Sequence, residues 1–183
     1  PLEKQVRDVV YDNIQLPAVI QAFRIPKQGT DDYYAIDMLA TLLSRGESSR
    51  LIKSVKDEQQ KALSVGTFPI NMEDPGVILA FGIANIGVEP KDLESAMNAE
   101  YVKVQNELIS EKEFQKLRNQ IESDFVSSNS RMAGIAESLA NYHMYYGSSN
   151  LINTEIQKYM KVTREDIQRV AKKYLTTDNS VVL

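Results

Sequence analysis

The sequence predicts an α+β fold in two layers, in which helices pack on one face of a mainly antiparallel sheet. Helical periodicity fills residues 31–45 and almost the whole chain after residue 90. Apolar, strand-like runs bounded by turn residues occupy 18–25, 62–70 and 77–86. With 183 residues, of which 43% are hydrophobic and 25% charged, the chain can bury one sizeable core. We therefore expect one domain over residues 1–183.

Two strands and a helix are predicted in the first part of the chain. Residues 9–11 form a short β-prone run, and the run 18–25 is longer. In the helix that follows, apolar residues recur with a period of three to four. Thr30 is placed to cap the start of this helix, and Gly46 supplies its end.

The middle of the chain predicts a short helix and a β-hairpin. Ser48 is placed to cap the short helix, which carries Leu51, Ile52 and Val55 on one face. The runs 62–70 and 77–86 are separated by a turn-like segment that contains Pro and Gly. They are expected to pair as antiparallel strands.

The last part of the chain is predicted to be helical, with clear start signals. Pro90 suits the first turn of one helix, and Ser110 with Glu113 forms the pattern of a capping box. The last helix begins with a second capping box, formed by Thr163 and Asp166. Two further helices are expected over 131–146 and around 152–159, and a final strand over 181–183.

His143 is the only histidine, and there are no cysteines. Disulfides, thiolate metal sites and a thiol nucleophile are therefore excluded, and this chain alone cannot complete a zinc motif with two histidines. His143 lies in step with an apolar stripe of its helix, made of Met132, Ile135, Ala136, Leu139 and Tyr146. We expect this stripe to be buried and His143 to be a packed or half-buried structural residue rather than a catalytic base.

Charge and hydropathy exclude further classes of function. The 21 Lys and Arg against 25 Asp and Glu give a net charge of −4, without basic runs, so we expect no nucleic-acid partner. No apolar stretch approaches the ~18–20 residues of a membrane span. Because the chain begins at Pro1 rather than Met, we expect a piece of a longer protein. The compartment stays open between cytoplasm and periplasm.

A turn between two helices is the one candidate cleft or interface. It contains Arg45, Gly46, Ser48, Ser49 and Arg50. A glycine turn followed by serines at a helix start could hold a phosphate or carboxylate. The segment lacks the glycines and the Lys-Ser/Thr pair of a phosphate-binding loop, so a simple helix–turn–helix connector is the competing interpretation.

Other polar clusters have structural explanations. The acids at helix starts, Asp31, Asp32, Glu111 and Glu113, fit capping and the helix dipole. Tyrosines on helices usually mark the edge of a core, and this applies to Tyr33, Tyr34, Tyr142, Tyr145 and Tyr146. The residues alone therefore give no catalytic constellation and no metal ligands.

Several segments together resemble a known family. Residues 16–26 and 32–39 resemble the opening of the C-terminal domain of insulinase-type (M16) zinc peptidases, especially bacterial members similar to mitochondrial processing peptidase. Residues 42–51 look like that family's Gly-Ser-Ser-Arg-Leu segment, and 162–167 with 170–175 are similar to its closing helix. The resemblance implies the fold shared by M16 peptidases and LuxS-like metallohydrolases.

The resemblance implies a non-catalytic role. In that family two halves close around an unfolded peptide, and an inverted His-x-x-Glu-His zinc motif lies in the first domain of one half. This chain has no such motif, and the run 77–86 lacks the Arg and Tyr that some members place against the substrate. The implied zinc therefore belongs to another M16 domain, in cis or in a partner subunit, and the implied substrate is an unfolded peptide.

Two alternatives remain from the sequence alone. One is a structural or assembly protein of the same fold, like the core subunits of respiratory complexes, with no peptidase role. The other is a helical interaction module. A zinc motif in the parent protein or in a partner would favour the peptidase interpretation.

Overall fold

The computed structural model describes residues 4–183, and its elements confirm the predicted α+β class. The strands are β1 (Val6–Arg7), β2 (Ala18–Arg24), β3 (Ala62–Ile70), β4 (Val77–Ala84) and β5 (Ser180–Val182). The α-helices are α1 (Asp31–Ser44), α2 (Pro90–Asn106), α3 (Glu111–Ser128), α4 (Met132–Tyr146), α5 (Glu155–Lys161) and α6 (Arg164–Tyr174). The shorter helical segments are η1 (Ile52–Glu58), η2 (Ser149–Asn153) and η3 (Thr177–Asn179).

The five strands form one sheet in the order β1-β5-β2-β4-β3. All neighbours are antiparallel except β1 and β5, which are parallel. The predicted hairpin is confirmed, because β3 and β4 pair from Ala62 opposite Ala84 to Ile70 opposite Val77. Strand β5, at the end of the chain, lies between β1 and β2, which are at its beginning. The sheet is therefore complete only when both ends of the described chain have come together.

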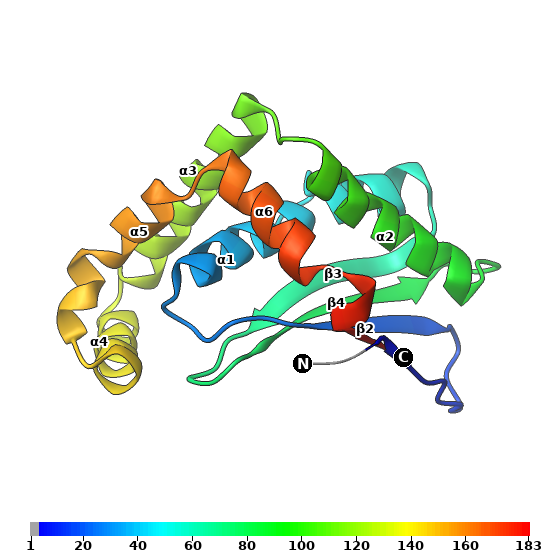
Figure 1. Ribbon diagram of the computed structural model, residues 1–183, viewed down its shortest axis with the longest axis horizontal. Coiled ribbons are helices and arrows are strands. Elements are labelled where there is room, and N and C mark those ends of the chain that lie inside the picture. Colours follow the sequence, from blue (N-terminus) through cyan, green and yellow to red (C-terminus); the bar gives the residue numbers. More distant parts are fainter. Residues whose placement is uncertain (1–3) are drawn as a thin grey trace.

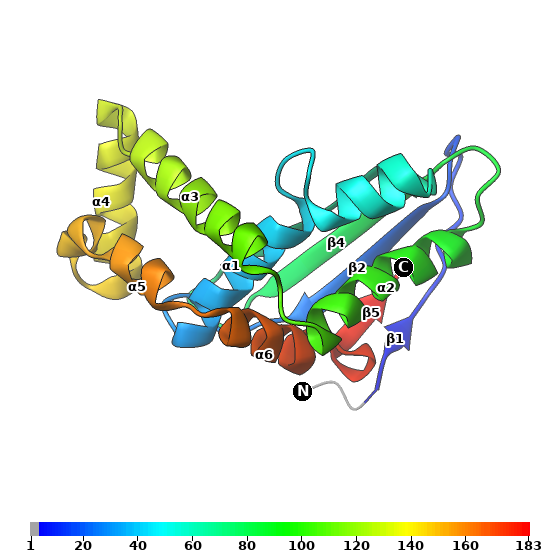
Figure 2. The ribbon, with the colours of Figure 1, turned by 90° about the horizontal axis from the view of Figure 1, so that it is seen from above.

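Helices α1, α2 and α6 cover one face of the sheet, as Figure 1 shows, and give the expected two layers. The core lies between these layers and contains Phe23, Leu39, Met97 and Ile167, which are at most 4% exposed. Gly82 permits the close approach of α2, because a Cβ there would lie 2.9 Å from the sulfur of Met97. Helices α3, α4 and α5 extend beyond the end of the sheet (Figure 2).

The predicted helix starts are mostly confirmed. The Thr30 hydroxyl accepts a hydrogen bond from the backbone of Tyr33, and Thr163 with Asp166 forms a complete capping box. The Ser110 hydroxyl accepts from the backbone of Glu113, but the Glu113 carboxylate does not return the bond. It binds another helix instead, as described below.

Two expectations near the N-terminal half are wrong in detail. Residues 9–11 form no strand, because the pairing with β5 involves only residues 6–7, and the side chains from Val9 to Tyr11 are exposed. The short helix after Gly46 is present, with Leu51 and Val55 buried, but most of it has π geometry. No side chain caps its start, and the Ser48 hydroxyl binds Lys116 instead.

The expected burial of α4 is also wrong. No α4 side chain is buried, His143 is exposed, and Ile135 and Leu139 remain 38% and 37% exposed. The cause is that α4 lies beyond the sheet, where η2 is its main neighbour among residues 4–183 (Figure 2). The helix itself ends as predicted, at Gly147 in the left-handed conformation.

Candidate functional site

The predicted cleft segment forms a tight turn between α1 and η1. Helix α1 ends at Ser44, whose hydroxyl donates to the backbone carbonyl of Thr67 and so ties this end of the helix to β3. Gly46 follows with φ of 82°, which is unfavourable for residues with a Cβ. The turn closes with a 2.9 Å hydrogen bond from the Ser49 amide to the Gly46 carbonyl.

Arg50 connects this turn to α3. Its guanidinium donates from Nε to Oε1 of Glu113 at 2.9 Å and from Nη2 to Oε2 at 2.8 Å. The side chains of Arg50 and Glu113 are 19% and 31% exposed, so water screens this bidentate pair only in part. These hydrogen bonds, which the Glu113 carboxylate accepts, raise the pKa of Arg50. The chain itself therefore supplies a carboxylate to Arg50, at a turn for which the sequence left an anion site and a simple connector open.

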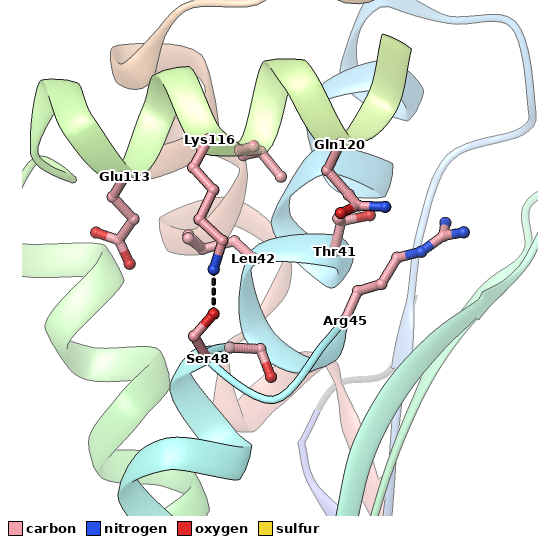
Figure 3. Close-up of a pocket in the computed structure, with 9 residues that line it drawn as sticks. Thr41, Leu42, Arg45, Ser48, Glu113, Lys116 and Gln120 are labelled. Atoms are coloured by element: carbon pink, nitrogen blue, oxygen red, sulfur yellow. Dashed lines mark hydrogen bonds between the residues drawn. The ribbon is translucent and has the colours of Figure 1, made fainter. Parts of the chain in front are cut away.

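A small cavity of about 40 Å³ lies between the turn and α3. Figure 3 shows Lys116 of α3 reaching across it to the Ser48 hydroxyl, which accepts a hydrogen bond from the Lys116 ammonium group. Ser49 also lines the cavity, is only 4% exposed, and its hydroxyl has no hydrogen-bond partner. Within residues 4–183 no carboxylate forms an ion pair with Lys116, which makes it the available cation of the site.

Arg45 also lines the cavity, but its guanidinium group does not turn towards Lys116 and Ser48. Figure 3 shows its side chain directed away from Ser48. Its Nη1 lies 3.0 Å from Oδ2 of Asp124, near the other end of α3. The turn thus makes two separate ionic contacts with α3, and both favour the connector interpretation.

Two carboxylates lie in an aromatic cluster beside α1. Tyr159 donates to Oδ2 of Asp37 at 3.0 Å, and Tyr142 donates to Glu155. Burial raises the pKa of both carboxyl groups. Tyr142 thus joins α4 to α5, and Tyr159 joins α5 to α1, so the cluster attaches α4 and α5 to α1.

The expectation that the helical tyrosines mark the edge of the core is confirmed only for some of them. Tyr34 is 2% exposed and stacks edge-on against Tyr33 and Tyr159. Tyr146 packs against Gly29, where a Cβ would lie 2.6 Å from its ring. Tyr145 is 44% exposed, so the expectation fails for this residue.

The acids at helix starts do more than cap. Asp32 accepts hydrogen bonds from Arg169, Lys173 and Tyr174 of α6, at 2.6, 2.8 and 2.7 Å. Burial would raise the pKa of Asp32, but these three donors outweigh it and lower the pKa to about 2. The ion pairs fix α1 against α6, which the capping explanation did not include.

The described residues do not fit a zinc ion. His143 stands exposed on α4, and no three His, Cys, Asp or Glu side chains within residues 4–183 come together as a metal site. A catalytic zinc site needs three protein ligands with an open position. No zinc chemistry is therefore assigned to this part of the protein.

The helices of residues 4–183 include none that is long and apolar enough to cross a membrane.

Sequence reasoning missed the residues of α3 that complete the site. Glu113 was explained by capping alone, and Lys116 was not singled out. Both face the turn because they lie three residues apart on one helical face. Arg50 precedes Leu51, which the sequence places on the apolar face of the short helix, and an arginine beside a buried face usually has an acidic partner; this is the signal that could have pointed to a distant carboxylate.

Comparison with known proteins places the fold and the family. A model of the peptidase M16 inactive domain matches residues 1–121. Zinc protease PqqE of Helicobacter pylori is 24% identical over 172 residues, which are 94% of this chain and 38% of PqqE. A crystal structure of a Helicobacter pylori protease superposes with a TM-score of 0.92 at 22% identity, covering 99% of this chain and 44% of that one.

A smaller relative matches over nearly its full length. It is an inactive peptidase domain from Bordetella parapertussis, with a TM-score of 0.81 and 19% identity over 96% of this chain and 93% of that chain. In contrast, the chain spans less than half of the Helicobacter pylori proteins. These likenesses show the shared fold, and the family match covers about two thirds of the sequence. Because the matched model covers more than half of the sequence, the chain belongs to the peptidase M16 family, as an inactive domain.

Proposed function

We propose that this domain is the non-catalytic part of a zinc-dependent M16 endopeptidase. In this proposal it helps to form a closed chamber that binds and positions unfolded peptides, while a zinc-bearing domain elsewhere cleaves them. The observation that carries the proposal is the match to the M16 inactive domain together with described residues that do not fit zinc. Zinc protease PqqE, which is more than twice as long as the matched region, supports a longer parent protein.

Such a domain contributes by holding and enclosing the peptide, and it supplies no group that reacts with it. Holding an extended peptide in place lowers the entropic cost of reaching the transition state, and closing a chamber excludes bulk water. The zinc ion, held elsewhere, would supply the activated water. We place the turn from Arg45 to Arg50 in the wall of this cleft, with Lys116 as the group available to a peptide carboxylate. Two observations support this placement: the Lys116 ammonium group binds the Ser48 hydroxyl but no carboxylate within residues 4–183, and the Ser49 hydroxyl has no hydrogen-bond partner there.

The proposal is tested in the parent protein by deleting residues 1–183. A quenched fluorescent peptide reports the rate of cleavage with and without a chelator, and elemental analysis reports zinc. We expect the deletion to retain zinc but to lose most of the chelator-sensitive rate. An unchanged rate would show that the domain is dispensable for catalysis and would favour the structural or assembly role.

A variant in the cleft gives a finer test. Lys116→Met removes the cation while keeping much of the side-chain volume, and we expect KM to rise for peptides that end in a carboxylate near the cleavage site. Lys56→Met, on the exposed surface of η1, is the matched control and should leave KM unchanged. Equal kinetics for the two variants would remove Lys116 from the cleft.

A further inference from the structure

The sheet is mostly apolar on both faces, although the helices lie on one of them (Figure 1). Strand β4 reads Val-Ile-Leu-Ala-Phe-Gly-Ile-Ala and contains no polar side chain. Its buried residues, such as Ile78 and Ala80, alternate with half-buried ones that point to the other face. An antiparallel sheet with one face in water normally alternates apolar and polar residues. This strand does not follow that pattern.

The strand register brings the outward side chains together. Leu79 lies opposite Ala22 on one side and Phe68 on the other, and Phe81 lies opposite Ile20. The rings of Phe68 and Phe81 are 6.3 Å apart. Further apolar residues of the same face are Ile70, Val77, Ile83 and Val181. These side chains form one continuous surface, which we call the open sheet face.

The open sheet face is accessible and almost uncharged. Phe68 and Ile20 are 46% and 40% exposed, and Leu79 and Phe81 are half-buried. Among the paired residues of β2 to β5 on this face, Arg24 at the rim is the only charged one. Depletion of charge at the centre of a surface, with aromatic residues present, is typical of a protein interface.

The size of the face indicates which kind of partner fits. Strands of about seven residues are ~24 Å long, and four strands span ~19 Å, so the face measures roughly 450 Å². An interface that covers it would bury about 900 Å² in total, which is typical of contacts between domains of one chain. Obligate homodimers usually bury about 2,000 Å² or more. The area therefore favours another domain over a second copy.

We propose that the open sheet face is the surface on which the zinc-bearing part of the parent protein docks, through an apolar and uncharged patch of its own. The proposal rests on the proposed function for the identity of the partner. Helicobacter pylori PqqE supports it, because this chain matches only 38% of that protein and leaves more than enough sequence for such a domain. Covering this face removes from water an apolar patch as large as the largest on a typical monomer.

Cysteine labelling in the intact parent protein tests the docking surface directly. This chain contains no cysteine, so Phe68→Cys introduces a single thiol into it, and other cysteines of the parent are replaced by serine. Leu108→Cys is the matched control, since Phe68 and Leu108 are both 46% exposed in this domain. Reaction with a maleimide is followed at protein concentrations at which the parent is a monomer.

We expect the thiol at position 68 to react at least about tenfold more slowly than the thiol at position 108, because labelling requires the interface to open. Equal rates would overturn the proposal. Ile20→Cys, at the centre of the face, repeats the measurement if the first variant does not elute like the unsubstituted parent. Protection that disappears on dilution would indicate a second copy, and protection only with added peptide would indicate a substrate surface. Either result contradicts docking of the zinc-bearing domain.

The same protein separates this inference from the proposed function. A protected thiol in a parent without chelator-sensitive peptidase activity would contradict the proposed function but retain the docking surface. A freely reactive thiol in an active peptidase would contradict the docking surface alone.

Discussion

The bidentate pair of Arg50 and Glu113 should stabilise the domain measurably. Glu113→Gln keeps the shape of the side chain and the backbone bond to Ser110, but removes the charge that faces Arg50. Hydrogen bonds to charged groups contribute about 1.5–3 kcal/mol, whereas fully exposed ion pairs contribute about 0–1 kcal/mol. With side chains 19% and 31% exposed, the pair lies between these cases, and we expect a loss of about 1–2 kcal/mol.

A double-mutant cycle with Arg50→Met isolates the interaction from other effects of each change. Urea unfolding at pH 7 gives the free energy of unfolding for the four proteins, and we expect a coupling energy of about 1–2 kcal/mol. The control cycle uses Lys53 and Glu58, which are 3.8 Å apart and 66% and 60% exposed. Its coupling should be below about 0.5 kcal/mol. A coupling for Arg50 and Glu113 as small as the control would refute the reasoning.

Substitutions at three further positions test the backbone conformation and an ion-pair cluster. Gly46→Val should destabilise by about 1–2 kcal/mol through its positive φ alone, because within residues 4–183 no atom beyond Gly46 and its two chain neighbours lies within 4 Å of the added Cβ, and Gly46→Asn should cost less. Gly134→Ala should lower Tm, since the new Cβ would lie 1.9 Å from the Ser128 carbonyl oxygen; an unchanged thermal melt would show that the joint between α3 and α4 can open freely. Asp32→Asn should cost about 1 kcal/mol at pH 7, a modest value because its partners Arg169 and Lys173 are 47% and 57% exposed. Because the folded-state pKa of Asp32 is lowered to about 2, this stabilisation is present above pH ~4 and disappears as the pH falls towards 2, so urea melts of variant and wild type should converge there. A difference that persists at pH 2 would contradict the role of the charge.

Local signals explain why much of the fold was predictable. Thr30, Gly147 and the Thr163 capping box act within a few residues of themselves, so their geometry depends little on the rest of the chain. The hairpin of β3 and β4 follows from adjacent apolar runs with a turn between them. These features fix where elements begin and end.

Contacts between distant residues explain what the sequence could not show. Arg50 and Glu113 are 63 positions apart, and although Arg50 beside Leu51 suggests an acidic partner, the sequence does not indicate which distant acid it meets. The stripe on α4 has the period of a buried helix face, yet α4 lies beyond the sheet and the stripe stays exposed. Periodicity shows that a face is apolar, but not whether anything within the same chain covers it.

Complementation in trans tests the central claim most directly. The zinc-bearing part of the parent is purified without residues 1–183, and its chelator-sensitive cleavage of a quenched fluorescent peptide is measured before and after addition of this domain. The account predicts no activity for the domain alone and a rate that rises and saturates as the domain is added to the zinc-bearing part. Chelator-sensitive activity in the domain alone, or a full rate without it, would contradict the account.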